Sequence, residues 1–363
     1  MINIGLSMGV DFRVFRENYL KAVNFEYPWF IPSFVSIPLP TWKRYREKLE
    51  KIVEKHRLIF PGFKRGMINY DTPTRPSSTY RDEWGCVWKY AVDGLQGIVV
   101  EAPLKDWSKL KDLKIPDPEL GLPREGEPPI PWSDVEAFID HVRSLGGLTI
   151  GFMPHGFLFL RLTYLRGYLN FLRDLVTQPP QLEKLIDIVT EYNVEVVKKL
   201  VKLRVDVVSF GDDLGIQKGF PYSIQKFRQY ILPRYKKIFS EAKRKGAKVR
   251  LHTDGYVMNI VEDIVSSGVD ILNIQENINR LEEIKNVLKG KVAIDIDVDR
   301  QRLLPFGTPK EIDIRVKKII QELGFKRGGL LFTAEILQDV PLSNIEALLN
   351  ALEKHSKLHL ECS

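Results

Sequence analysis

VDVVSFGDDLG (residues 205–215) and KVRLHTDG (residues 248–255) are the two short segments on which the fold prediction depends. Each begins with β-branched or apolar residues typical of a strand inside a sheet, and each ends on polar, titratable side chains. The sequence between them predicts a helix. A parallel strand that ends on Asp or His, followed by a helix and the same pattern again, is how a βα-barrel builds an active site. We therefore expect the candidate site at the carboxyl ends of these two strands.

The alternation of strand and helix extends over the second part of the chain, where six strands are predicted: 148–153, 205–210, 249–252, 270–274, 291–296 and 329–333. Between the second and third strands, Ser223 is the predicted N-cap of a helix that Pro233 kinks or restarts and Gly246 ends. Such alternation implies parallel strands with right-handed crossovers. The sequence predicts an α/β fold, a (β/α)8 TIM-type barrel that is either complete or distorted. A doubly wound sheet is the alternative, but no G-x-G-x-x-G or Walker-type loop follows an early strand.

Residues 1–145 are organised differently, because they hold 14 of the 22 prolines and all six tryptophans. We expect an irregular cap there, with a small hairpin in which residues 87–91 pair with 97–101 across Asp93 and Gly94. Residues 33–37 predict one further barrel strand, and no segment stands out as the eighth. We predict a single domain over 1–363, with the cap, hairpin and first strand in 1–145 and regular βα units in 146–355.

The composition is that of an ordinary globular protein, with 44% hydrophobic and 28% charged residues. The net charge of +7 is spread along helical stretches without a zinc-finger, RNP or helix-turn-helix signature, so we expect no nucleic acid partner. Only Cys86 and Cys362 occur, which excludes a disulfide framework and indicates a reducing compartment. No signal segment and no run of 18 apolar residues is present, so we expect a cytoplasmic protein that does not enter a membrane.

Several motifs in a fixed order resemble the uroporphyrinogen decarboxylase superfamily: EAPLKDWSKL (101–110), IPDP (115–118), GDDLG (211–215), HTDG (252–255), GVDILN (268–273), LPFGTP (304–309) and DVPLSNI (339–345). The resemblance implies a (β/α)8 barrel with its cleft at the strand carboxyl ends. It also implies one of two chemistries, either decarboxylation of porphyrinogen acetate groups or zinc-dependent methyl transfer between methyl-corrinoid proteins and thiols.

The chain departs from both branches of the family in ways that bear on its chemistry. The decarboxylases resemble one another in an R-Q-A-G-R-Y stretch that this chain lacks. The methyltransferase branch has His-x-Cys on one strand and a further Cys on the last strand, and here these positions fall on His252, Asp254 and a site near Ala334 or Glu335. The resemblance therefore implies a metal set of His252, Asp254 and Glu335, a harder ligand field that suits Zn²⁺, Mn²⁺ or Fe²⁺.

The residues at the strand ends can also act without a metal. Asp213, His252 and Asp254 are the predicted catalytic residues, since a carboxylate in such a cleft can pair with pyrrole or amine N–H groups or act as a general acid or base. Asp212 is either a substrate-binding residue or a helix N-cap for the residues after Gly215.

Other strand ends offer further substrate-binding candidates: His155, Gln275, Glu276, Asp295 and Tyr80. For His155 a structural role is an equal alternative, and Asp297 shares a strand face with Asp295. Arg161 and Arg166 lie five residues apart on a predicted helix, where a surface or capping role is favoured over binding of a carboxylate or phosphate.

These observations favour a metal-assisted methyltransferase that uses a corrinoid, bound directly or carried by a partner protein. The alternatives are a metal-free decarboxylase of a porphyrinogen or related carboxylated substrate, and a non-catalytic tetrapyrrole binder. The proline-rich first half could cover either the barrel mouth or a homodimer interface.

Overall fold

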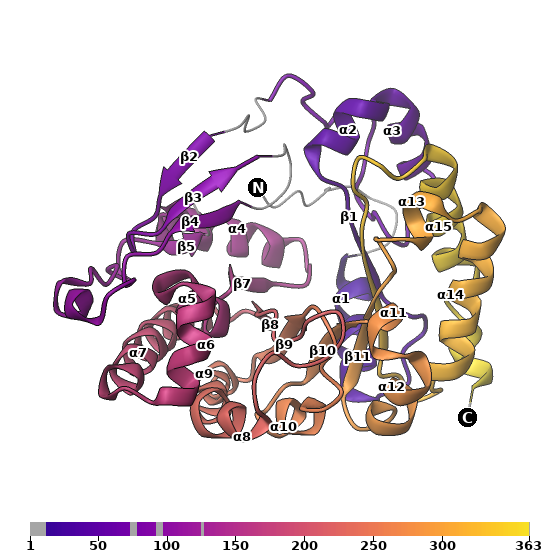
Figure 1. The fold of residues 1–363 in the computed structure, drawn as a ribbon. Helices are drawn as coiled ribbons and strands as arrows, with labels where there is room; N and C mark the ends of the chain where they lie inside the picture. Colours follow the sequence, from indigo (N-terminus) through magenta and orange to yellow (C-terminus); the bar gives the residue numbers. More distant parts are fainter. Residues whose placement is uncertain (1–11, 73–77, 92–96, 125–126, 363) are drawn as a thin grey trace. The chain divides into compact units, whose positions relative to one another are not determined.

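The computed structural model describes residues 12–72, 78–91, 97–124 and 127–362 (Figure 1). The chain divides into two compact units, which are described separately. Unit 1 comprises residues 1–74, 144–148 and 273–363, and unit 2 comprises residues 75–143 and 149–272.

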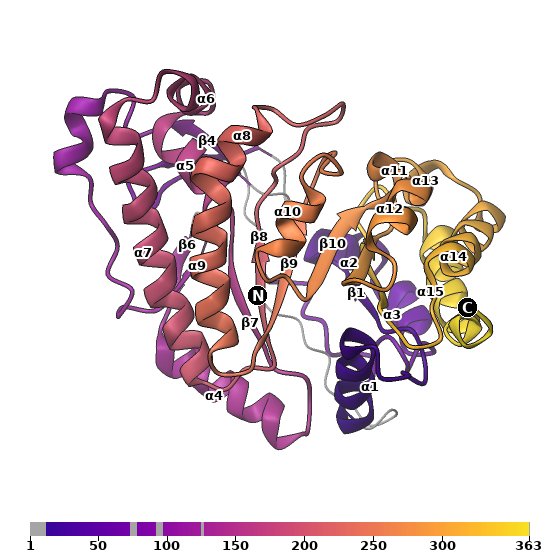
Figure 2. The ribbon, with the colours of Figure 1, turned by 90° about the horizontal axis from the view of Figure 1, so that it is seen from below.

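Unit 2 is built on three parallel strands, β7 (Ile150–His155), β8 (Val207–Gly211) and β9 (Lys248–Thr253), with β8 in the centre. The connection from β7 to β8 contains α5 (Phe159–Arg166), α6 (Tyr168–Thr177) and α7 (Pro180–Lys202), and α10 (Val261–Ser266) follows β9. Helix α7 packs on β7 and β8 and against α9 (Leu232–Lys243), and Figure 2 shows α7 and α9 side by side. Buried aromatic rings from the strands and helices fill the space between them.

The connection from β8 to β9 confirms the predicted helix and its break. Ser223 accepts a hydrogen bond from the Lys226 backbone N–H at the start of α8 (Ile224–Lys226). A π-helical turn, η2 (Phe227–Ile231), follows, and α9 then begins with Pro233 in its first turn, where a missing N–H costs no hydrogen bond. Gly246 adopts φ +84° soon after the helix ends.

The remainder of unit 2 forms the cap. Strands β2 (Ser78–Arg81), β3 (Val87–Tyr90) and β4 (Ile98–Glu101) make an antiparallel sheet, so the predicted pairing of 87–91 with 97–101 is confirmed, although its turn at 92–96 lies outside the described residues. The cap continues with η1 (Trp107–Asp112), the hairpin of β5 (Leu122–Arg124) and β6 (Glu127–Ile130), and α4 (Trp132–Ser144).

Unit 1 contains three parallel strands in the order β1 (Ser33–Ser36), β12 (Leu330–Glu335) and β11 (Ala293–Asp297). Helices α14 (Pro309–Leu323) and α15 (Leu342–Lys354) pack against each other (Figure 1), and α14 begins with a capping box between Thr308 and Glu311. The other helical elements are α1 (Phe12–Asn24), α2 (Leu39–Tyr45), α3 (Glu47–Val53), α11 (Glu276–Asn279), α12 (Leu281–Leu288), α13 (Leu303–Phe306) and η3 (Leu358–Glu361).

The six strands predicted for the second part of the chain all occur, as does the strand predicted near residues 33–37. β10 (Ile271–Gln275) contains the point at which unit 2 passes into unit 1. In the described ranges seven strands therefore alternate with helices in the (β/α)8 manner, which confirms an α/β fold of the distorted barrel type. No helix among the described residues is both long enough and apolar enough to cross a membrane.

Candidate functional site

The two motifs at the ends of β8 and β9 form one continuous structure. Gly211 lies opposite His252 in the parallel register, and the ladder continues beyond both strands. The Asp212 backbone N–H donates to the His252 carbonyl at 3.0 Å, and the Gly215 N–H donates to the Asp254 carbonyl at 3.1 Å. The GDDLG and HTDG segments are therefore held in register by backbone hydrogen bonds. These bonds fix the backbone positions from which the acidic side chains extend.

Two glycines allow these segments to cross. A Cβ atom on Gly255, which has φ +81°, would lie 2.2 Å from the carbonyl carbon of Gly215. A Cβ atom on Gly215 would lie 2.6 Å from the carbonyl carbon of Gly255. Since no side chain fits at either position, the final glycine of each motif is explained by this crossing.

A β-bulge in β7 determines where His155 points. Phe152 lies opposite Ser209 and His155 opposite Gly211, so three steps along β7 match two steps along β8. In a regular strand His155 would share a face with Met153, which is buried. The extra residue turns His155 toward the face of Phe152 instead, which is how bulges redirect side chains near functional sites.

Three side chains converge at these strand ends, and we call them the His–Asp–His cluster: His155, Asp213 and His252. Asp213 Oδ1 lies 3.1 Å from His155 Nε2 and 3.7 Å from His252 Nε2. One ligand atom from each residue lies within 4.8 Å of the other two. Asp254 borders the cluster, with Oδ1 3.4 Å from His252 Nε2 and its backbone N–H donating to Asp213 Oδ1 at 3.2 Å. The structure thus brings together the three predicted catalytic residues and adds His155.

The surroundings of the cluster set its charge. Burial opposes ionisation of Asp213, but the hydrogen bond and charge of His155, the charge of His252 and the Asp254 N–H outweigh it and lower the Asp213 pKa to about 2. Burial also lowers the pKa of His252 below its usual 6.5, although the Asp254 and Asp213 carboxylates oppose that change. At neutral pH the cluster therefore presents an ionised carboxylate and a neutral His252 imidazole.

The donor set fits a divalent metal ion. Zinc bonds to His nitrogen and carboxylate oxygen at about 2.0–2.2 Å, which places neighbouring ligand atoms of a tetrahedral site roughly 3.3–3.6 Å apart. The distances of 3.1 and 3.7 Å from Asp213 Oδ1 lie on either side of that range. Two imidazoles and one carboxylate also suit Mn²⁺ or Fe²⁺.

Asp212 lies next to Asp213 in sequence but has different surroundings. It is fully buried and accepts hydrogen bonds from the backbone N–H groups of Phe159 (2.6 Å) and Leu160 (2.8 Å) and from the Tyr235 hydroxyl (2.8 Å). Burial raises its pKa to about 6 against the effect of these bonds. The cap predicted for the residues after Gly215 is therefore wrong, because the side chain caps α5 instead. A substrate contact by Asp212 stays a prediction that would require these bonds to break.

The remaining predicted residues, at the end of β10, directly after it, and on β11 and β12, belong to unit 1. Glu276 is buried and pairs with Arg315, with 3.0 Å between Oε1 and Nε, and its predicted substrate-binding role stays a prediction. The neighbouring Gln275 is also buried, and its carbonyl accepts from Asn279 Nδ2 at 3.0 Å.

Asp295 Oδ2 accepts a hydrogen bond from Thr333 Oγ1 at 3.0 Å. Arg300 Nη1 lies 3.3 Å from both Glu335 Oε2 and Asp297 Oδ2, so an arginine that the sequence did not single out joins the ends of β11 and β12. The roles predicted for Asp295 and Glu335 remain predictions.

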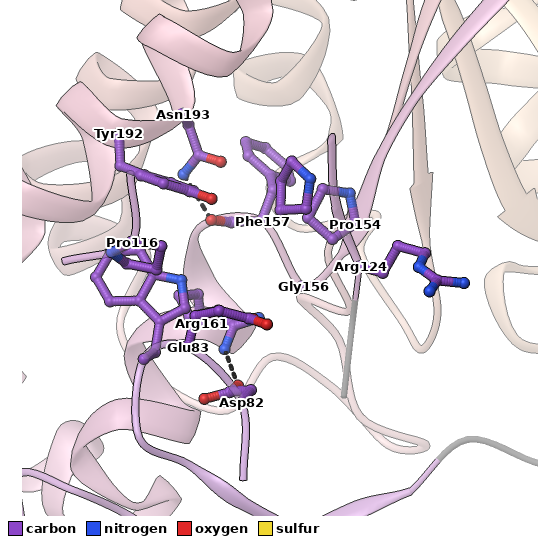
Figure 3. Close-up of a pocket in the computed structure, with 12 residues that line it drawn as sticks. Asp82, Glu83, Pro116, Arg124, Pro154, Gly156, Phe157, Arg161, Tyr192 and Asn193 are labelled. Atoms are coloured by element: carbon purple, nitrogen blue, oxygen red, sulfur yellow. Dashed lines mark hydrogen bonds and ion pairs between the residues drawn. The ribbon is translucent and has the colours of Figure 1, made fainter. Parts of the chain in front are cut away.

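A small cavity of about 20 Å³, room for about one water, lies beside the loop that follows His155 (Figure 3). Arg161 Nη1 and Asp82 Oδ2 form a buried ion pair at 2.8 Å in its wall. The surface role predicted for Arg161 and Arg166 is wrong, because Arg166 is also buried and pairs with Asp174 at 2.7 Å.

Tyr80, predicted to bind substrate, lies on β2, and its hydroxyl donates to Glu83 Oε1 at 3.1 Å. Burial, followed by the charge of Glu83, raises its pKa to about 12. The binding role of Tyr80 stays a prediction.

Comparisons with known proteins place the chain in a family. Residues 84–355 match the model of the uroporphyrinogen decarboxylase (URO-D) family. The chain belongs to the uroporphyrinogen decarboxylase family. The uroporphyrinogen decarboxylase of Geobacter sulfurreducens is 23% identical over 278 residues, which cover 73% of this chain and 75% of that protein. The enzyme of the same name from Geobacter metallireducens is 22% identical over the same share of each chain.

Among solved structures, a methyltransferase from Methanosarcina mazei has the same fold, with a TM-score of 0.67 at 19% identity. The match covers 94% of this chain and 98% of the methyltransferase. This URO-D family member therefore shares its barrel architecture with a methyltransferase, while its sequence matches decarboxylases.

Proposed function

We propose that this URO-D family protein is a metal-dependent methyltransferase that passes a methyl group from a methyl-corrinoid to a thiol. The His–Asp–His cluster carries the proposal, because three ligand atoms from three adjacent strand ends converge within 4.8 Å. Asp213 and His252 are in the protonation states that a metal requires. The fold shared with the Methanosarcina mazei methyltransferase supports the same reaction class.

In this mechanism His155, Asp213 and His252 would hold Zn²⁺ or another divalent ion. When bound, the metal lowers the pKa of the acceptor thiol and so supplies a nucleophile at neutral pH. Asp254 lies beside the cluster with its side chain partly exposed, so it can accept the thiol proton and release it to solvent. The resemblance-based set of His252, Asp254 and Glu335 remains the alternative ligand set.

The test is turnover of zinc-loaded protein with methylcobalamin and 2-mercaptoethanol. Loss of methylcobalamin absorbance and appearance of the methyl thioether by mass spectrometry would report the reaction. We expect His155→Ala and Asp213→Ala each to reduce turnover at least about 100-fold. His141→Ala, an exposed histidine on α4, is the matched control and should retain full activity. Equal turnover in all four proteins would contradict the proposal.

Metal-free decarboxylation is the second candidate, because both Geobacter relatives are decarboxylases and Asp213 stays ionised without a metal. In that mechanism the Asp213 carboxylate would pair with pyrrole N–H groups of a porphyrinogen or a related carboxylated substrate. Release of CO₂ from uroporphyrinogen in the presence of a chelator, abolished in Asp213→Asn, would favour it. Binding of the tetrapyrrole without turnover, unchanged in Asp213→Asn, would indicate a non-catalytic binder.

A further inference from the structure

A second cavity in unit 2 lies among different residues from those of the His–Asp–His cluster. It has a volume of about 540 Å³, within the range of about 300–1,000 Å³ that ligand pockets occupy. One wall is the second half of α6 with Gln178, and the other is formed by Pro221, Tyr222 and Ser223 together with Lys226 at the end of α8. We call this cavity the α6–α8 groove.

The apolar part of the α6–α8 groove consists of Leu172, Leu175, Val176 and Pro221. Val176 is 74% exposed. Leu175 is fully buried, so Leu172, Val176 and Pro221 offer the surface that an alkyl chain or ring could cover, with the free energy gain of apolar burial.

The charged part of the groove is entirely basic. Arg173 lines it from α6 and Lys226 from α8, and no lining residue is acidic. Among the described residues neither cation forms an ion pair with a carboxylate. The Lys226 ammonium contacts the neutral amide oxygen Gln229 Oε1 at 3.1 Å and lies 5.5 Å from the centroid of the Tyr230 ring. Two cations on opposite walls without acidic partners are complementary to an anion of charge close to −2.

The wall formed by Tyr222 is held by contacts with two other aromatic rings. Its ring stacks on Phe159 with 5.3 Å between centroids and lies 4.4 Å from the Phe220 ring centroid. The Tyr222 hydroxyl is buried and has no hydrogen-bond partner among the described residues. Because this hydroxyl is inaccessible and lies near the buried Asp212 carboxylate, the Tyr222 ring and not its hydroxyl lines the groove.

We propose that the α6–α8 groove binds a phosphate monoester with an apolar body. The phosphate carries about −1.5 to −2 charges at pH 7 and so matches Arg173 and Lys226, whereas a carboxylate would neutralise only one of them. The apolar body would lie against Leu172 and Val176. This site goes beyond the proposed methyl transfer and does not depend on it.

Isothermal titration of the full chain with octyl phosphate, octanoate and octanol tests the proposal. We expect octyl phosphate to bind one per chain with a Kd below about 1 mM, octanoate more weakly, and octanol not at all. Octanoate binding as tightly as octyl phosphate would overturn the assignment of a doubly charged ligand. Equal binding of octanol would show a merely apolar surface, and no binding of octyl phosphate would remove the site.

Two pairs of variants locate the binding. The double variant Arg173→Glu, Lys226→Glu should weaken octyl phosphate binding at least about tenfold, whereas Lys236→Glu, an exposed lysine on α9, should not. Val176→Asp should also weaken it, whereas Leu169→Asp should not, although Leu169 lies on the same helix and is 75% exposed. Equal losses within either pair would place the ligand outside the groove.

Discussion

Asp212 and Asp213 are adjacent in sequence, yet the structure gives them opposite tasks. Asp212 satisfies the first two N–H groups of α5, the helix that follows the His155 loop, whereas Asp213 contacts His155 directly. We infer that Asp212 positions the loop between His155, the last residue of β7, and α5. The sequence could predict two acids at a strand end but not this division, because the α5 donors lie about fifty residues away in the chain.

The pair Asp212→Asn and Asp213→Asn separates the two tasks. Asp212→Asn replaces an acceptor by a donor among buried N–H groups, so we expect it to lower the free energy of unfolding by about 3 kcal/mol in urea denaturation. Asp213→Asn, at a partly exposed position, should cost about 1 kcal/mol or less but remove metal binding. A larger loss of unfolding free energy in Asp213→Asn than in Asp212→Asn would contradict this assignment.

The pKa of His252 predicts how metal affinity depends on pH. Burial lowers this pKa below 6.5, so the imidazole is mostly neutral above pH 6.5 and protons compete little with the metal there. The protonated fraction grows as the pH falls toward the lowered pKa, and the affinity should then fall. Zinc titrations between pH 5 and 8 measure the profile. An affinity that already declines between pH 8 and 7 would show that the folded-state pKa is raised instead.

At the scale of elements, the crossing of the loops after β8 and β9 depends on two glycines. Gly255→Ala combines a positive φ with a backbone clash, and Gly246→Ala has a similar φ of +84° with nothing within 4 Å of its Cβ. We expect Gly246→Ala to lower the free energy of unfolding by about 1 kcal/mol, and Gly255→Ala to lower it by about 2 kcal/mol more, measured by thermal unfolding. Equal losses of unfolding free energy in the two variants would show that the two loops can move apart to admit the Gly255→Ala methyl group.

Element prediction succeeded where the pattern is local. The apolar runs near residues 205–210 and 249–252 specify β8 and β9, and Ser223 and Pro233 specify where helices begin. The position of His155 could not be predicted, because alternation along β7 places it on the Met153 face and only the bulge against β8 reverses this. Bulges are set by the partner strand, which a single segment does not reveal.

On the scale of the whole molecule, the alternation of strands and helices in the sequence predicted the α/β barrel class. The sequence did not predict how the irregular cap is attached. Within unit 2, Asp82 joins the cap to α5 by accepting from Arg161 and from Trp88 Nε1, both at 2.8 Å. Arg161 looked like a surface residue because its partner lies 79 residues away. Long-range pairs of this kind fix the cap to the helices that follow β7.

Removing one member of that pair should be costly. Arg161→Ala leaves the buried Asp82 carboxylate without its cation, so we expect a loss of about 3–5 kcal/mol of unfolding free energy. Arg81→Ala is the control, because Arg81 precedes Asp82 at the end of β2 but is exposed and pairs loosely with Glu101 at 3.6 Å. We expect it to lower the unfolding free energy by less than about 1 kcal/mol. Comparable small losses in urea denaturation would mean that the cap is held by other contacts.

The most direct test of the central claim is the metal content of untagged protein, followed by cobalt(II) titration of the chelator-treated form. The account predicts one ion per chain, visible bands of a tetrahedral nitrogen and oxygen site, and loss of both in His155→Ala and His252→Ala but not in His141→Ala. Retention of the metal in His155→Ala would contradict the His–Asp–His cluster as the ligand set. Absence of stoichiometric binding in the unmodified protein would contradict metal-dependent methyl transfer.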